Sequence, residues 1–147
     1  MSSEQQGTYV ESPIIMTTVR IVAPFALTFG LFVMFHGAES AGGGFQGGAV
    51  VGAVILMLAF AYGIEPTRDW LGSSPLALSA AVGVIVFAAV GLGAILFGGG
   101  FLEYPVYGID HASKYGIELV ELGIGATVAG VITALFFLIA AGFDLEV

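Results

Sequence analysis

The stretch LALSAAVGVIVFAAVGLGAILF, residues 76–97, contains no charged side chain. A transmembrane helix needs about 20 apolar residues, because each residue adds about 1.5 Å and the hydrocarbon core is about 30 Å thick. The strands of a membrane β-barrel alternate between lipid-facing and lumen-facing side chains, and this stretch does not alternate. The stretch therefore predicts a helix that spans a membrane.

Three further apolar stretches of similar length lie at residues 14–36, 45–63 and 117–141. We therefore expect an all-α fold, an integral membrane bundle of four transmembrane helices over residues 14–141. The remaining residues form a predicted polar N-terminal tail, 1–13, and a predicted acidic C-terminal tail, 142–147.

The composition agrees with a membrane protein. Of the 147 residues, 58% are hydrophobic and 10% are charged, whereas about a quarter of an average soluble domain is charged. The absence of cysteine excludes disulfides, thiolate metal sites and cysteine nucleophiles. A formal net charge of −8 argues against a basic face that binds nucleic acid or anionic lipid. These features disfavour a soluble enzyme and a nucleic-acid-binding protein.

The three basic residues predict an orientation in the membrane. Arg20 near the start of the first span and Arg68 in the loop between the second and third spans fall on one side, and Lys114 in the loop between the third and fourth spans falls on the other. The side with more basic residues is usually cytoplasmic, so we expect both termini in the cytoplasm. Arg20 is expected to extend back to the interface, and Trp70 to lie in the interfacial aromatic belt.

The segment FHGAESAGGGFQGG, residues 35–48, separates the first two spans. It contains the pattern GxGxxG at Gly42, Gly44 and Gly47. A dinucleotide-binding site needs a strand before this pattern and an acidic residue about 20 positions later. A membrane helix precedes the pattern here and an apolar run follows it, so nucleotide binding is not expected. The glycines instead allow a tight turn and a close approach of the second helix to a neighbour.

This segment resembles the signature of the MnhB/MrpB subunits of multisubunit Na⁺/H⁺ antiporters of the Mrp type. The matching residues are Phe35, His36, Gly37, Ser40, Gly42, Gly43, Gly44, Phe45, Gly47 and Gly48. Ala41 departs from the pattern, because the family usually has proline there. In the fourth span, Glu121 followed by Gly123 resembles an acidic element of the family, which usually has aspartate. The resemblance covers residues 14–141, nearly the whole chain.

The resemblance implies a multi-pass subunit of the cell membrane that frames or contributes to the ion route of a Na⁺/H⁺ antiporter. Its implied partners are the other membrane subunits of a Mrp-type complex, with Na⁺ and H⁺ as transported ions and the lipid bilayer around it. No cofactor and no catalysed reaction are expected. Two alternatives remain: a structural module of a hydrogenase-type or respiratory ion pump, and a stand-alone small channel. The absence of an inverted repeat disfavours the second.

Ionisable residues near membrane depth are the candidates for the ion route, namely Glu121, Glu118 and His36. The two glutamates lie three residues apart and therefore on one side of the fourth helix. Glu121 shares its face with small residues at every fourth position, so it is expected to face protein rather than lipid. The candidate partner of Glu121 is Lys114 or a cation on another subunit. Alternatively, both glutamates lie hydrated in the first helical turn.

His36 is either a hydrogen-bonding residue at the end of the first helix or part of the ion route, since histidine titrates near physiological pH. The loop 98–116 contains four aromatic residues that are expected to belong to the interfacial belt, namely Phe101, Tyr104, Tyr107 and Tyr115. Asp110 and His111 are adjacent, but a zinc site needs three or four ligands. We therefore expect no metal site.

Overall fold

The computed structural model describes residues 12–39 and 41–142. Ser40 of the signature segment, and the predicted tails apart from residues 12, 13 and 142, lie outside the described residues. The four long helices are α1 (Pro13–Met34), α2 (Gly44–Tyr62), α4 (Ser73–Leu96) and α5 (Ala112–Gly142). Each is long and apolar enough to cross a membrane, and the described ranges contain no strand. The predicted all-α fold with four spans is confirmed.

The start of α5 differs from the prediction. The helix begins at Ala112, directly after His111, whose φ of 57° ends the preceding loop. Lys114 therefore lies inside the helix, and the prediction that it lies in a loop is wrong. Glu118 and Glu121 are the seventh and tenth residues of α5, so the alternative that places both in its first turn is also wrong. Hydropathy marks the apolar part of a helix and misses a polar turn that precedes it.

A short helix, α3 (Ile64–Leu71), occupies the segment predicted as a loop between the second and third spans. Gly63 and Gly72 flank it with φ values of 102° and 71°, which glycine adopts readily. Glu65 and Arg68 form an ion pair of 3.7 Å across one helical turn. Trp70 is 76% exposed in α3, and its place in the interfacial aromatic belt stays a prediction.

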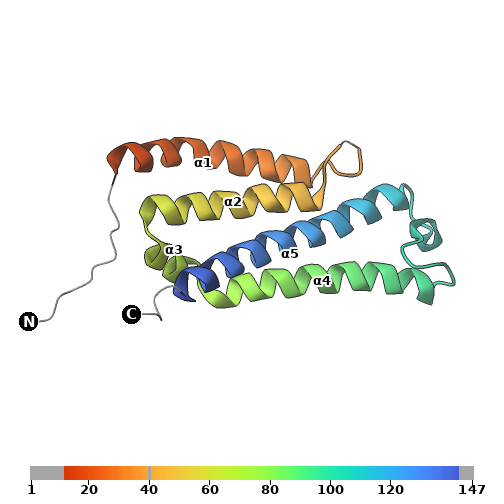
Figure 1. The fold of residues 1–147 in the computed structure, drawn as a ribbon. Helices are drawn as coiled ribbons and strands as arrows, with labels where there is room; N and C mark the ends of the chain where they lie inside the picture. The colour runs from red at the N-terminus through yellow and green to blue at the C-terminus, as the bar shows by residue number, and fades with distance from the viewer. Residues whose placement is uncertain (1–11, 40, 143–147) are drawn as a thin grey trace, which may run out of the picture.

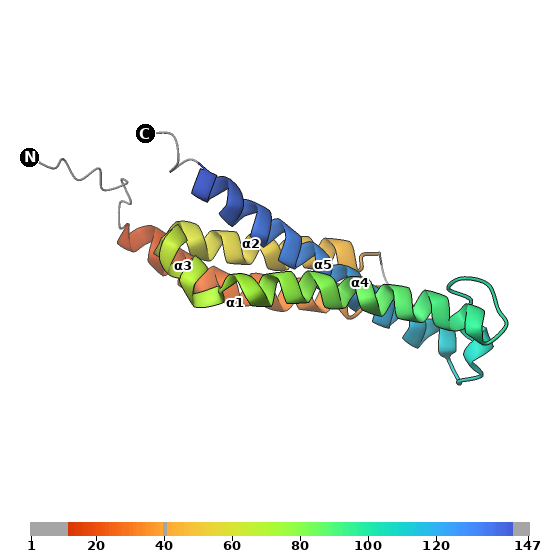
Figure 2. The same ribbon diagram turned by 90° about the horizontal axis from the view of Figure 1, so that it is seen from below.

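The four long helices lie side by side in the order α1, α2, α5, α4 (Figure 1). Among the described residues, α1 and α4 do not contact each other, and they form the two outer edges of the row. Figure 2 shows the same helices turned by 90°. Large apolar side chains remain exposed on both outer helices, including Phe25 and Phe32 on α1 and Ile85 and Leu96 on α4. Lipid or partner helices must cover these faces, since such patches are unfavourable in water.

Parallel helices α2 and α5 pack through glycine. A Cβ atom added at Gly44 would collide with the carbonyl of Glu121, and one added at Gly48 would lie 2.5 Å from the carbonyl oxygen of Gly125. One turn further, a Cβ at Gly52 would lie 3.7 Å from the carbonyl oxygen of Ala129. Each four-residue step on α2 therefore meets a four-residue step on α5, which is the small-residue packing that brings membrane helices close together.

Candidate functional site

The predicted ion-route residues lie at one end of the helix row. At this end α1 and α4 terminate and α2 and α5 begin (Figure 1). His36 follows the last residue of α1 by two positions, and Glu118 and Glu121 lie in the first third of α5. Both glutamates are half-buried. The fold therefore brings the two sequence elements of the family resemblance, the glycine segment and the acidic element, to the same place.

The glycines of the signature segment enclose the side chain of Glu121. A Cβ atom added at Gly37 would overlap its Oε2 atom, and one added at Gly43 would overlap its Oε1 atom. Gly42 directly precedes Gly43, and its φ of 133° is a backbone conformation that other residues rarely adopt. Backbone without side chains therefore forms the wall on one side of this carboxylate. We call the arrangement of Gly37, Gly43, Gly44 and Glu121 the glycine–glutamate site.

The Oε2 atom of Glu121 is buried and has no hydrogen-bond partner in the described part of the chain. Within the same residues, no basic side chain forms an ion pair with Glu121. Burying a carboxylate oxygen without a partner costs free energy, so an unpartnered oxygen in a native protein indicates a bound water, ion or proton, or a functional role. The site can relieve this cost by taking up a proton or a monovalent cation.

Lys114 pairs with Glu39 and not with the glutamates of its own helix. The Lys114 ammonium donates a hydrogen bond to Oε1 of Glu39, in the signature segment 75 residues earlier. This hydrogen bond and the charge of Lys114 lower the pKa of Glu39, with a smaller contribution from the charge of His36. Because that pKa is lowered, the pair is present at neutral pH and is lost as the pH falls through it.

The Glu39–Lys114 pair connects the signature segment to the first turn of α5, next to the glycine–glutamate site. The ion pair of Glu39 was not predicted from the sequence, because the family resemblance gave no role to this position. The available signal was the opposite charge of two segments predicted on the same side of the membrane. Exposed ion pairs contribute little to stability, so this one positions the segment more than it stabilises the fold.

His36 makes the contacts of a residue at a helix end. Its Nδ1–H donates to the carbonyl oxygen of Phe32 at 2.9 Å, and its ring stacks on the Phe32 ring with 4.1 Å between centroids. A carbonyl can only accept, so this contact places a proton on Nδ1. The geometry agrees with the helix-end interpretation, and a role of His36 in the ion route stays a prediction.

Like Glu39, Tyr104 lies near the glycine–glutamate site although the sequence did not predict this position. It lies in the short helix η1 (Tyr104–Tyr107), and a Cβ added at Gly116 of α5 would collide with its ring. Burial raises the pKa of the Tyr104 hydroxyl, and the charge of Glu121 raises it further. The neighbouring Tyr107 donates to the carbonyl oxygen of Val90 at 2.5 Å. These two tyrosines therefore anchor the third loop to α4 and α5.

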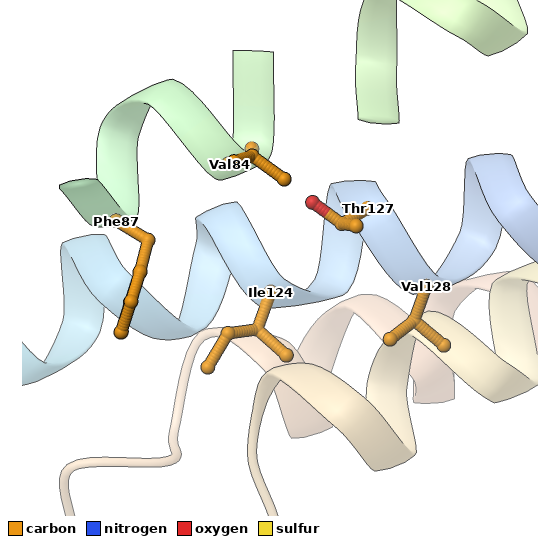
Figure 3. A pocket seen from close by; sticks show the side chains of 6 residues that line it. Val84, Phe87, Ile124, Thr127 and Val128 are labelled. Carbon is orange, nitrogen blue, oxygen red and sulfur yellow. The ribbon is translucent and has the colours of Figure 1, made fainter. Parts of the chain in front are cut away.

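An apolar pocket of about 300 Å³ lies between α4 and α5, away from the glycine–glutamate site. Figure 3 shows Val84 and Phe87 of α4 beside Ile124, Thr127 and Val128 of α5. The hydroxyl of Thr127 lies 3.0 Å from the carbonyl oxygen of Gly123 and 3.2 Å from that of Ala80. The hydroxyl therefore donates its hydrogen bond to the protein backbone and not to a ligand in the pocket. This pocket suits an acyl chain or an apolar side chain and is unsuited to an ion.

These features define a class of protein: a multi-pass membrane protein with an acidic side chain enclosed between its helices. Residues 14–134 match the family described as a domain related to the MnhB subunit of Na⁺/H⁺ antiporters. The chain belongs to this family.

Curated relatives agree with this assignment. The chain is 32% identical over 140 residues to a Staphylococcus haemolyticus protein named "Putative antiporter subunit mnhB2", and the match covers 90% of this chain and 97% of the relative. A Staphylococcus aureus protein with the same name is 30% identical over 142 residues, with the same coverage. The similarity therefore extends over nearly the full length of both relatives.

Proposed function

We propose that this chain is a membrane subunit of a multisubunit Na⁺/H⁺ antiporter and that Glu121 contributes to the ion route. The observation that supports this role most strongly is the buried, unpartnered Oε2 of Glu121 inside the glycine wall of the signature segment. A carboxylate enclosed in protein without a basic partner is neutralised by binding a proton or a cation, and can release it again. Intramembrane acids of this kind mark ion and proton pathways.

Glu118 and His36 have secondary roles in this proposal. Glu118 lies one turn nearer to the start of α5 and would pass ions between water and Glu121. His36 borders the site from the end of α1. The other membrane subunits of the complex supply the rest of the path, and we propose no chemical reaction for this chain. The relatives are named as antiporter subunits, which favours this complex over a hydrogenase-type ion pump.

We expect the isolated chain to be inactive in transport. Between Leu122 and Gly142, α5 contains no ionisable residue, α4 contains none, and α2 contains only its last residue, Tyr62. An ion bound at Glu121 therefore has no chain of ionisable side chains that leads through these three spans to the far side of the membrane. The full chain reconstituted alone in vesicles should show no Na⁺-dependent pH change, whereas the complete complex should. Robust antiport by the chain alone would contradict the proposal and favour a stand-alone carrier.

The proposed orientation places the glycine–glutamate site at the outer side of the cell membrane, with both termini in the cytoplasm. The chain has no cysteine, so a maleimide that labels this chain must react with the single cysteine that was introduced. Ser113 at the start of α5 and Ser74 at the start of α4 are exposed and lie at opposite ends of the helices. In intact cells, a membrane-impermeant maleimide should label Ser113→Cys and should leave Ser74→Cys unlabelled until the cells are lysed. The reverse pattern would place the site on the cytoplasmic side.

A further inference from the structure

A second pocket lies at the opposite end of the helix row, where α1 begins and α2 ends. It has a volume of about 340 Å³ and is lined by Pro13, Met16, Thr17, Arg20 and Tyr62. This volume falls in the range of about 300–1,000 Å³ that is typical of small-molecule sites. The function proposed above does not use any of these residues.

Arg20 is the charged group of this pocket. Among the described residues, no carboxylate forms an ion pair with it, whereas Arg68 pairs with Glu65 and Lys114 with Glu39. The α1 residues that line the pocket all precede Arg20, so its guanidinium extends toward the start of the helix. This is the direction in which a long basic side chain near a helix end reaches the lipid headgroups.

The surroundings of the pocket indicate the depth of the headgroup layer. The polar helix α3, with exposed Trp70, follows α2 directly at this end. Tryptophan is enriched at the boundary between headgroups and acyl chains. α1 also forms an outer edge of the helix row, so the pocket lies where lipid can reach it.

We propose that this pocket binds the phosphate of an anionic phospholipid headgroup, through an ion pair with Arg20 and hydrogen bonds from the hydroxyls of Thr17 and Tyr62. Guanidinium matches the geometry of a phosphate and forms charge-assisted hydrogen bonds with it. The lining residues include no carboxylate that could accept the ammonium of a zwitterionic headgroup. The site therefore selects headgroups with a net negative charge, despite the net charge of −8 of the whole chain.

The test measures which lipid the purified full-length chain retains. Native mass spectrometry in detergent would compare phosphatidylglycerol with phosphatidylcholine, and a separate sample would contain glycerol phosphate without acyl chains. Wild-type chain should retain phosphatidylglycerol about fivefold better than phosphatidylcholine, as expected for one arginine near a membrane surface. Glycerol phosphate should not displace the lipid, because acyl chains contribute to its binding.

Variants identify the residue responsible. Arg20→Gln should abolish the preference for phosphatidylglycerol, Arg20→Lys should retain part of it, and Tyr62→Phe should weaken it about twofold, the scale of one surface hydrogen bond. Arg68→Gln is the matched control, since this arginine lies at the same end outside the pocket. An unchanged preference in Arg20→Gln, or an equal loss in Arg68→Gln, would overturn the proposal. So would an Arg20→Gln variant that loses assembly of the complex while it keeps the lipid, because Arg20 would then pair with a partner carboxylate.

Discussion

Replacing Glu121 with glutamine should lower antiport by the assembled complex about tenfold or more, or shift its pH profile, while the complex still assembles. Glutamine keeps the size of glutamate, and a glycine wall with no basic partner does not require a charge for packing. The amide cannot exchange a proton, and proton transfer by a positioned side chain typically contributes at least about a hundredfold to a rate. Antiport should be measured in vesicles as a function of pH, at matched abundance of the complex.

The matched control is Glu118→Gln, which removes the same charge one turn nearer to the start of α5. We expect a smaller effect there, because Oε2 of Glu121 is the buried and unpartnered oxygen among the described side chains. Wild-type antiport in both variants would mean that Glu118 and Glu121 do not take part in the ion route and that this subunit has a structural role.

Replacing Gly48 with leucine should prevent normal assembly of the complex. A Cβ at this position would lie 2.5 Å from the carbonyl oxygen and 2.9 Å from the Cα atom of Gly125, which are backbone atoms of a long helix and cannot move aside. Overpacking of this kind costs typically about 1–3 kcal/mol, and separation of α2 from α5 would also open the glycine–glutamate site. The amount of intact complex recovered from the membrane measures the effect.

Gln46→Leu is the control for this substitution, because it introduces the same side chain on an exposed face of α2, two residues away. It should leave assembly intact. If Gly48→Leu assembled normally and only transport failed, packing would not explain the glycine, and a direct role of the segment would be favoured.

The all-α class and the number of membrane-spanning helices could be predicted from the sequence, because long apolar runs determine membrane spans. The predicted boundaries were less accurate where a helix includes polar residues outside its apolar run. The turn at the start of α5 contains Ser113 and Lys114 and is helical although it is polar. Likewise, α3 has the composition of a loop, and it forms because two glycines separate it from its neighbours and Glu65 pairs with Arg68.

The two parts of the glycine–glutamate site could be predicted from the sequence, but the contact between them could not. The glycine segment and Glu121 were each identified from the sequence, and their contact depends on the packing of α2 against α5. No pattern within one helix specifies that Gly37 and Gly43 meet a side chain more than 75 positions later. The pairing of Lys114 with Glu39 has the same origin, and the sequence alone therefore offered Lys114 as a candidate partner of Glu121 instead.

In the proposed ion route, Glu121 takes up a proton inside the glycine–glutamate site of the assembled complex. Carbodiimides add to protonated carboxylic acids, so the modified glutamates of this chain can be mapped by mass spectrometry after treatment of the complete complex at neutral pH. We predict modification of Glu121 and none of Glu39, which Lys114 holds as an exposed carboxylate. A complex in which Glu121 remains unmodified while Glu39 or Glu118 reacts would contradict the role of Glu121 in the ion route.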